Sequence, residues 1–306
     1  MKIINHSILG SGLSAVVKNQ IEKNSTIFSN FYGKKVKSKR FYELQSFGGN
    51  TNIWGGYINY KKFKIFMRNK KFKSFIQNND IFEIKKFIMD KKLNFTNILY
   101  RRNKKEIFRI KRKDFKSKIV NTKIEKLELS NKFITLYSKK KRYKSDRVSL
   151  CIGNLGLLEL MHNSNFINMK DKISFVDGNC AYNINFFLNI KKSYYIPMSL
   201  KEIFFKLFYG KIDSYKNNIN KTLMVQQFSY NHKKYVYTLE EILSYKSNHI
   251  RYFLSNHVVD LRINNIPISK YINNISKKIK IYGSGTCKKY LPGPISQNLI
   301  YDAIVK

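Results

Sequence analysis

The chain has 306 residues, of which 43% are hydrophobic, so it can bury a full core and is not a disordered tail. Its 59 Lys and Arg against 19 Asp and Glu give a formal net charge of +40, which raises the alternative of a nucleic-acid or anionic-surface binding protein. The abundant residues are Lys, Asn, Ile, Phe and Tyr, all with A/T-rich codons, and the basic residues are spread along the chain. The sequence therefore favours a partner other than nucleic acid.

The chain carries Cys151, Cys180 and Cys287 at wide spacing, which predicts neither a disulfide framework nor a metal site. Its start, MKIINHSILGSGLSAVV, is similar to a signal peptide, but Asn5, His6 and two glycines interrupt the apolar run, which favours a buried strand and turn. No apolar run approaches the roughly 20 residues that a membrane-spanning helix needs. We therefore expect a cytoplasmic location and no transmembrane segment.

The first elements predict the opening of a βαβ unit. Ile3 to Leu9 predicts a buried strand, GSG a tight turn, and Leu13 to Glu22 a helix with apolar residues on one face. STIFSNF, residues 25–31, predicts the second strand. From Phe63 to about Ile119 the sequence is dense in Lys, Phe and Ile, and the one pattern is a helical spacing around residues 81–89.

The second half predicts alternating strands and helices. Residues 124–152 indicate three successive strands linked by polar turns, and GNLGLLELM then opens a helix after a glycine turn. TLMVQQFSYN and KYVYTLEEIL indicate another strand pair and the start of a helix. KKIKIYGSGT indicates a strand and a glycine turn, and SQNLIYDAIVK a closing helix. The order of elements is typical of an α/β fold.

Gly10, Gly12 and Ala15 form a GxGxxA pattern between the first strand and the first helix. Gly10 permits the tight turn, Gly12 lets the backbone approach a pyrophosphate, and Ala15 lets helix and strand pack closely. An acidic residue that would bind a ribose is missing at the end of the second strand, where Ser29 and Asn30 could form hydrogen bonds instead. A purely steric glycine turn is the alternative.

Twelve of the 14 glycines lie in short turns of this kind, among them the two pairs in SFGGNTNIWGGYIN, residues 46–59. One long dinucleotide that crosses the edge of the sheet would explain the separated clusters, because each βα turn contacts a different part of it. Ordinary turns of an α/β fold remain the other interpretation.

ILGSGLSA, GGNTNIWGG, VSLCIGNLGLLELM and IKIYGSGTCKKYLPGPISQNLIYDAI occur in the order seen in glucose-methanol-choline (GMC) type flavin oxidoreductases, which this chain resembles in a shortened form. The resemblance implies a Rossmann-type FAD-binding sheet and a smaller, mainly antiparallel β substrate region. It implies that FAD is bound by Gly10, Ser11, Gly12, Ala15, Gly48, Gly49, Asn50, Thr51, Trp54, Gly55, Gly56, Val120, Gly153, Gly283, Ser284, Gly285 and Ile295.

The resemblance implies an FAD-binding domain of residues 1–169 and 250–306 and a reduced substrate domain of residues 170–249. It also implies oxidation of a small-molecule alcohol by hydride transfer to the flavin, with His257 as the catalytic base and an unknown electron acceptor. The family's second catalytic residue falls near Ile295, and Asn298 and Asn256 are the two alternatives for its role. A flavoprotein fold that has lost its catalytic activity is therefore an alternative. For His257, the alternative to a catalytic role is a histidine that is simply packed and hydrogen-bonded.

Overall fold

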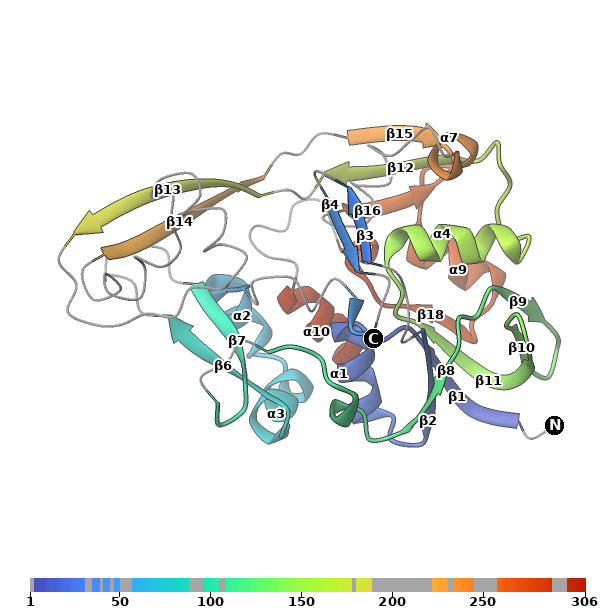
Figure 1. Cartoon of the computed structure of the whole chain (residues 1–306), viewed down its shortest axis with the longest axis horizontal. Helices are drawn as coiled ribbons and strands as arrows, with labels where there is room; N and C mark the ends of the chain where they lie inside the picture. The colour runs from blue at the N-terminus through green and yellow to red at the C-terminus, as the bar shows by residue number, and fades with distance from the viewer. Residues whose placement is uncertain are drawn as a thin grey trace.

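The computed structural model describes residues 3–30, 35–38, 41–44, 47–49, 57–87, 96–104, 108–177, 180–188, 222–230, 234–244, 258–287 and 296–306. Figure 1 shows that a twisted sheet near the two chain ends lies between helices, with smaller antiparallel sheets beside it. None of the described helices is long and apolar enough to cross a bilayer.

The main sheet has seven strands in the order β8-β2-β1-β11-β10-β9, with β18 paired to the second half of β11. β8, β2, β1, β11 and β18 pair in parallel, and β11, β10 and β9 form an antiparallel meander. The bounds are β1 Ile3–Leu9, β2 Ser25–Ser29, β8 Lys118–Asn121, β9 Lys126–Leu129, β10 Ile134–Tyr137, β11 Arg142–Leu150 and β18 Ile279–Ile281. With the helix between β1 and β2, this is a Rossmann-type arrangement.

The sheet is covered on both faces because successive strand residues point to opposite sides. Ile8 and Ile27 belong to the hydrophobic cluster under α1 and α10, whereas their neighbours Leu9 and Phe28 belong to the cluster under α4 and α9. The helices are α1 Leu13–Ile21, α4 Asn154–Asn163, α9 Ile268–Ile275 and α10 Ser296–Val305. The central strands β1, β2 and β11 are therefore buried on both faces toward their carboxyl ends, as their apolar runs predict, whereas β8 at the edge is half-exposed.

Residues 57–87 and 96–104 form a separate layer against α10. A sheet of order β5-β7-β6 packs with two helices, and Phe66 of the first helix stacks on Tyr301 of α10 with 4.1 Å between ring centroids. The bounds are β5 Tyr57–Asn59, α2 Tyr60–Phe66, α3 Lys70–Asn78, β6 Phe82–Phe87 and β7 Thr96–Arg101. This layer extends the core on one face of the main sheet.

The helix predicted around residues 81–89 is wrong, because β6 occupies Phe82–Phe87 and pairs with β7. The side-chain oxygen of Asn79 accepts hydrogen bonds from the backbone N–H groups of Ile81 and Phe82, at 3.2 and 3.0 Å, directly after α3 ends. Such an Asn turn ends a helix and turns the chain. The apolar residues that follow serve a strand and not a helix.

A buried ion pair fastens this layer to the segment that leads into β8. Arg101 contacts both carboxylate oxygens of Asp114, at 2.7 and 3.0 Å, and also donates to the backbone carbonyl of Arg109 at 2.5 Å. Asp114 ends the short 3-10 helix η2, Arg112–Asp114, and accepts from the backbone N–H of Lys111 at 2.7 Å. The bidentate geometry satisfies both buried charges.

The other described strands are antiparallel. The order β15-β12-β16-β17 forms a sheet beside α4 and α9, β13 pairs with β14, and β3 pairs with β4. Their bounds, with the two short helices nearby, are β3 Lys35–Ser38, β4 Phe41–Leu44, β12 Lys172–Asp177, β13 Cys180–Leu188, β14 Thr222–Tyr230, β15 Lys234–Thr238, α7 Leu239–Leu243, β16 Val258–Ile263, β17 Ile266–Pro267 and η3 Ser284–Thr286. The predicted pair TLMVQQFSYN and KYVYTLEEIL consists of two strands, β14 and β15, that pair with other partners.

The predicted α/β fold with a Rossmann-type sheet and a separate antiparallel sheet is confirmed. The strands predicted at residues 3–9 and 25–31, the three strands within 124–152 and the closing helix all stand where the patterns indicate them. β16, which starts at Val258, pairs with β12, so the antiparallel sheet draws on strands from either side of residue 250.

Candidate functional site

The carboxyl ends of the parallel strands β1, β11 and β18 bring three glycine-containing turns to one edge of the sheet. β1 lies between β2, which follows it in the chain, and β11, which comes much later. The chain therefore winds in opposite directions from β1, and the edge between β1 and β11 is a topological switch point. Open α/β sheets bind their ligands in the crevice at such a point.

The turn after β1 is packed against the turn after β11. Gly10 has a φ of +103°, and its N–H donates to the carbonyl of Phe28 at 2.8 Å. A Cβ added at Gly10 would lie 2.4 Å from the backbone oxygen of Cys151. Gly10 is therefore required by the backbone conformation and by the contact between the two turns.

The N-terminus of α1 faces this edge without a side-chain cap. Gly12 is the N-cap residue, with an extended backbone and no side-chain cap, and the first turn of α1 has no acidic residue. Ala15 is fully buried, which fits the close packing that a small residue permits at this position. The helix thus presents its positive end at this edge, an arrangement that favours an anion.

Ser11 connects the first turn to β2 and to the second glycine segment. Its hydroxyl lies 2.8 Å from the hydroxyl of Ser29 and accepts from the N–H of Gly48 at 2.8 Å. Gly48 and Gly49 have φ values of +86° and +51°, the left-handed region that glycine adopts without a steric cost. The structure therefore brings together two segments that are separated in the sequence, and Ser29 at the end of β2 binds Ser11.

The turn after β11 is open. Gly153 is the N-cap residue of α4, again with an extended backbone and no side-chain cap, and no atom of the described residues lies within 4 Å of a Cβ added there. The same holds for Gly156 in the first turn of α4. The N-terminal turn of α4 consequently has a bare face that can approach another molecule.

The turn after β18 is attached to the start of α4 by an asparagine that the sequence patterns did not indicate. Asn154 donates through Nδ2 to the hydroxyl of Ser284 at 3.0 Å and accepts through Oδ1 from the N–H of Gly285 at 3.1 Å. A Cβ added at Gly283 would have one neighbour, the carbonyl oxygen of Ile152, at 3.7 Å. In the sequence, the start of α4 showed a glycine turn between a strand and a helix, and nothing there indicated a role for Asn154.

Several predicted residues lie apart from these turns or outside the described residues. Val120 lies in β8, half-buried, opposite Phe28 of β2. Seven predicted site residues lie outside the residues that the structure describes: Asn50, Thr51, Trp54, Gly55, Gly56, His257 and Ile295. Their placement stays a prediction.

The first turn of α10 holds buried polar groups that have no hydrogen-bond partner among the described residues. These are the hydroxyl of Ser296, whose residue is 2% exposed, and Nδ2 of Asn298, whose residue is 4% exposed. Unpaired polar atoms in a protein interior call for a ligand or an ordered water molecule. Asn298, which the sequence offered as one replacement for a catalytic side chain, is thus a buried residue with an unused donor.

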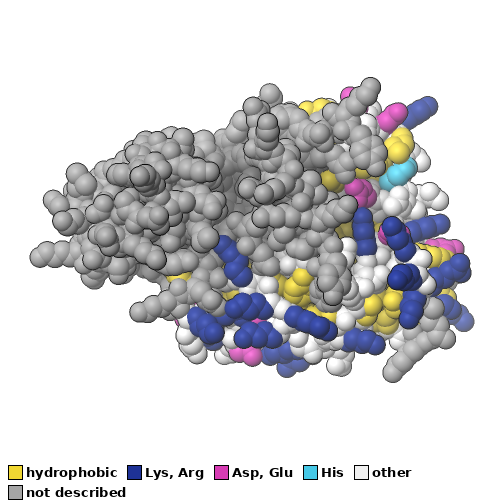
Figure 2. All heavy atoms as spheres, viewed as in Figure 1, with side chains coloured by type: hydrophobic (Ala, Val, Ile, Leu, Met, Phe, Trp, Pro, Cys, Tyr) yellow, Lys and Arg dark blue, Asp and Glu magenta, His cyan; other side chains and the backbone are white. Residues whose placement is uncertain are grey.

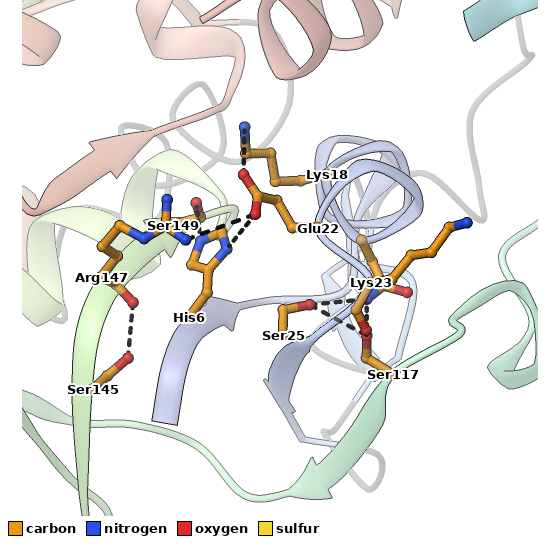
Figure 3. A network of polar contacts seen from close by, with 10 residues as sticks. His6, Lys18, Glu22, Lys23, Ser25, Ser117, Ser145, Arg147 and Ser149 are labelled. Carbon is orange, nitrogen blue, oxygen red and sulfur yellow. Dashed lines mark hydrogen bonds and ion pairs between the residues drawn. The ribbon is translucent and has the colours of Figure 1, made fainter. Parts of the chain in front are cut away.

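Below the glycine turns, between β1, β11 and the C-terminal end of α1, lies a buried cluster of titratable groups (Figure 3). Nε2 of His6 lies 2.8 Å from the hydroxyl of Ser149, and Nδ1 lies 3.7 Å from a carboxylate oxygen of Glu22. Burial lowers the pKa of His6 to about 4, against the attraction of Glu22, and the nearby Arg147 and Lys18 lower it further. The side chain of His6 therefore links β1 to β11 and to the end of α1.

Cys151 and Cys287 are free, buried thiols near the turns after β11 and β18. Burial raises the pKa of Cys151 to about 12 and also raises the pKa of Cys287. Burial lowers the pKa of Lys18, whose Nζ lies 5.0 Å from the ring centroid of Tyr282. Cys151 packs in the cluster under α1, whereas Cys287 packs with Val176 and Val259, and neither thiol is poised as a nucleophile.

Comparison with protein-family models gave no match, and comparison with curated proteins gave none either. Similar solved structures include a ferredoxin-flavin thioredoxin reductase from Clostridium acetobutylicum, at 12% identity and a TM-score of 0.22, over 50% of this chain and 38% of that one. NikD, an unusual amino acid oxidase essential for nikkomycin biosynthesis, matches at 7% identity and a TM-score of 0.40, over 100% of this chain and 95% of NikD. CtdE in complex with FAD matches at 9% identity and a TM-score of 0.39, over 99% of this chain and 83% of CtdE.

This chain therefore spans 38% of the length of the thioredoxin reductase and most of the length of the other two proteins. At these identities and TM-scores, the similarities do not assign an activity or a cofactor to this chain.

Proposed function

We propose that the protein is an FAD-dependent oxidoreductase. The observation that carries the proposal is the switch point between β1 and β11, where α1 and α4 both begin at glycine N-caps without side-chain caps. A dinucleotide with a pyrophosphate needs this combination of a positive helix end and a backbone it can touch.

The residues at this edge fit FAD. Gly12 and the N-terminal turn of α1 offer N–H groups for the pyrophosphate, and Ser11 and Ser29 offer hydroxyl groups beside β2, where a ribose would lie. The bare face at Gly153 and the half-exposed Ser284 offer further contact along the edge. When bound, FAD supplies hydride acceptance, and these residues bind and orient it.

The donor that we propose is a small-molecule alcohol, which is the substrate class implied by the resemblance to GMC-type enzymes. His257 would accept the hydroxyl proton, with residues 1–169 and 250–306 as the cofactor domain and residues 170–249 as the substrate domain. Ile295 stands where that family has a second catalytic side chain, so the buried amide of Asn298 is our candidate for that role. The electron acceptor is not implied by any of these features.

The test of cofactor binding is reconstitution of the purified full chain with FAD. We expect a yellow protein with one flavin per folded molecule. Gly12→Ala should lose flavin and keep its fold, because Gly12 has a φ of −72°, which alanine adopts without strain. Gly210→Ala, outside every glycine motif, is the control and should keep its flavin. A colourless wild-type chain that cannot take up FAD would overturn the proposal.

The test of chemistry is anaerobic reduction of the bound flavin by a panel of alcohols in stopped flow. Bleaching of the flavin by alcohols but not by amines supports the proposed donor class. Reduction by amines alone overturns the alcohol donor and keeps the flavoprotein. A flavin that binds but is reduced by no donor in the panel supports a flavoprotein fold that has lost its chemistry.

A further inference from the structure

Asn154 sits where two of the glycine turns meet. It is the first residue of α4, is 5% exposed, and reaches across to the turn after β18. Its amide makes two hydrogen bonds there, one with the hydroxyl of Ser284 at 3.0 Å and one with the backbone N–H of Gly285 at 3.1 Å. A Cβ at Gly285 would lie 2.5 Å from Oδ1 of Asn154, so glycine at this position makes the close approach possible.

The chemistry of the partners fixes the orientation of the amide. A backbone N–H can only donate, so the atom of Asn154 that faces Gly285 must be the oxygen. The NH₂ group therefore faces Ser284 and donates to its hydroxyl oxygen. A hydroxyl that accepts in this way still has its own hydrogen to donate.

That hydrogen is free to point away from the protein. Among the described residues, the hydroxyl of Ser284 has its hydrogen bond to Asn154 alone. Ser284 is half-exposed, and the preceding Gly283 meets only one atom near the position of a Cβ. The backbone around Ser284 is held as well, because the hydroxyl of Thr286 donates to the carbonyl of Gly283 at 2.8 Å. The serine hydroxyl is consequently a fixed donor at an open part of the edge.

We propose that Asn154 is a positioning residue that sets Ser284 as a hydrogen-bond donor to an oxygen or nitrogen acceptor of FAD. The inference rests on the proposed function, because it takes FAD as the molecule at this edge. Asn154 itself acts through Ser284 and through the N–H of Gly285, so its effect on the cofactor is indirect.

The test is Asn154→Asp in the full chain. A carboxylate of the same shape still accepts from Gly285 but cannot donate, so the hydroxyl of Ser284 turns inward to it. An acidic residue in the first turn of α4 favours the helix, so the melting temperature of the apoprotein should stay equal or rise. The dissociation constant for FAD, measured by quenching of flavin fluorescence, should rise about 2- to 10-fold.

A double-mutant cycle with Ser284→Ala separates positioning from repulsion between the new charge and the FAD phosphates. Ser284→Ala should weaken FAD binding by a similar factor, and adding Asn154→Asp to it should cause little further loss. Asn131→Asp, in the exposed β9–β10 turn, adds the same charge elsewhere and should leave the affinity unchanged.

Unchanged FAD affinity in Asn154→Asp, or an equal further loss when it is added to Ser284→Ala, would overturn the positioning role and leave the proposed function intact. A wild-type chain that binds no FAD would overturn the proposed function and this assignment together.

Discussion

Two neighbouring strand–turn–helix units of the main sheet, β1 with α1 and β11 with α4, use glycine for different reasons. Both helices begin at a glycine N-cap with no side-chain cap. In the first unit Gly10 is pressed against the backbone oxygen of Cys151, whereas in the second unit Gly153 faces open space. The same glycine pattern in a sequence can therefore serve internal packing or leave room for a ligand, and only the neighbours decide which.

The two helices also differ in what they bury. The buried face of α1 includes Lys18 and Asn19, and Lys18 interacts with the His6 and Glu22 cluster. The buried face of α4 is largely apolar, with Leu157 and Leu158 at its centre. Protonation of His6 should consequently affect the stability of the first unit.

Gly10→Ala should have the largest effect. A methyl group there meets the carbonyl of Cys151, and alanine is strained at a φ of +103°. We expect a loss of about 3 kcal/mol or more in the free energy of unfolding, from backbone strain and overpacking together. Urea denaturation of the apoprotein measures it, with Gly210→Ala as the control. Wild-type stability in Gly10→Ala would mean that the two turns are not in contact.

Acid should destabilise the first unit through His6. Its pKa is about 4 in the folded state and near 6.5 when unfolded, so the unfolded chain binds the proton more readily between these values. Stability that is complete above pH 6.5 should fall toward pH 4, by at most about 1.4 kcal/mol per pH unit for one proton. Arg147 and Lys18 disfavour the charged imidazole, whereas Glu22 opposes them.

The measurement is urea denaturation from pH 7.5 to pH 4, comparing the wild type with His6→Gln. The slope against pH should be smaller in His6→Gln, because other groups titrate alike in both proteins. Equal slopes in the two proteins would refute the contribution of His6 to the stability of the first unit.

Gly153→Ala should change ligand binding without changing the fold. Its added methyl group meets no protein atom within 4 Å, and the extended backbone at this position accepts alanine. If FAD lies against this face, we expect the dissociation constant to rise about tenfold, which corresponds to about 1.4 kcal/mol. Titration of the apoprotein with FAD and a melting curve decide it. A lower melting temperature with an unchanged dissociation constant for FAD would show that Gly153, like Gly10, serves internal packing.

Gly156→Ala should have the smallest effect and the opposite sign. It lies inside the first turn of α4, and a methyl group there is also free of contacts. Alanine should stabilise the helix by about 0.5–1 kcal/mol, because glycine loses more conformational freedom on folding. Thermal unfolding measures the gain. A loss of stability would show that the face of α4 is covered by protein.

The main sheet was predictable because its strands are short apolar runs bounded by turn residues, as in residues 3–9 and in the meander before α4. The layer formed by residues 57–87 and 96–104 was not predictable. Its position depends on contacts between distant parts of the chain, such as the stacking of Phe66 on Tyr301. Local spacing suggested a helix at 81–89, where the turn at Asn79 and pairing with β7 produce a strand.

Part of the candidate site followed from topology alone. Parallel strands place their following turns at one edge, so the meeting of the turns at Gly12, Gly153 and Gly283 was implied once the strands were recognised. The amide of Asn154 could not be recognised in this way, because its role depends on its distance from Ser284 in space. The same holds for the bond between Ser11 and Ser29.

The two buried thiols beside these turns make the protein its own reporter of local opening. Only a thiolate reacts with an alkylating reagent, and the raised pKa values of Cys151 and Cys287 keep both groups protonated near neutral pH. Each can therefore be alkylated only during a transient excursion that exposes it. Peptide mapping would give the alkylation rate of each thiol separately. The rate at Cys151 reports the opening of the turn after β11. The rate at Cys287 reports the opening of the contact between η3 and β16, where the carbonyl of Cys287 accepts from the backbone N–H of Asp260 at 2.7 Å.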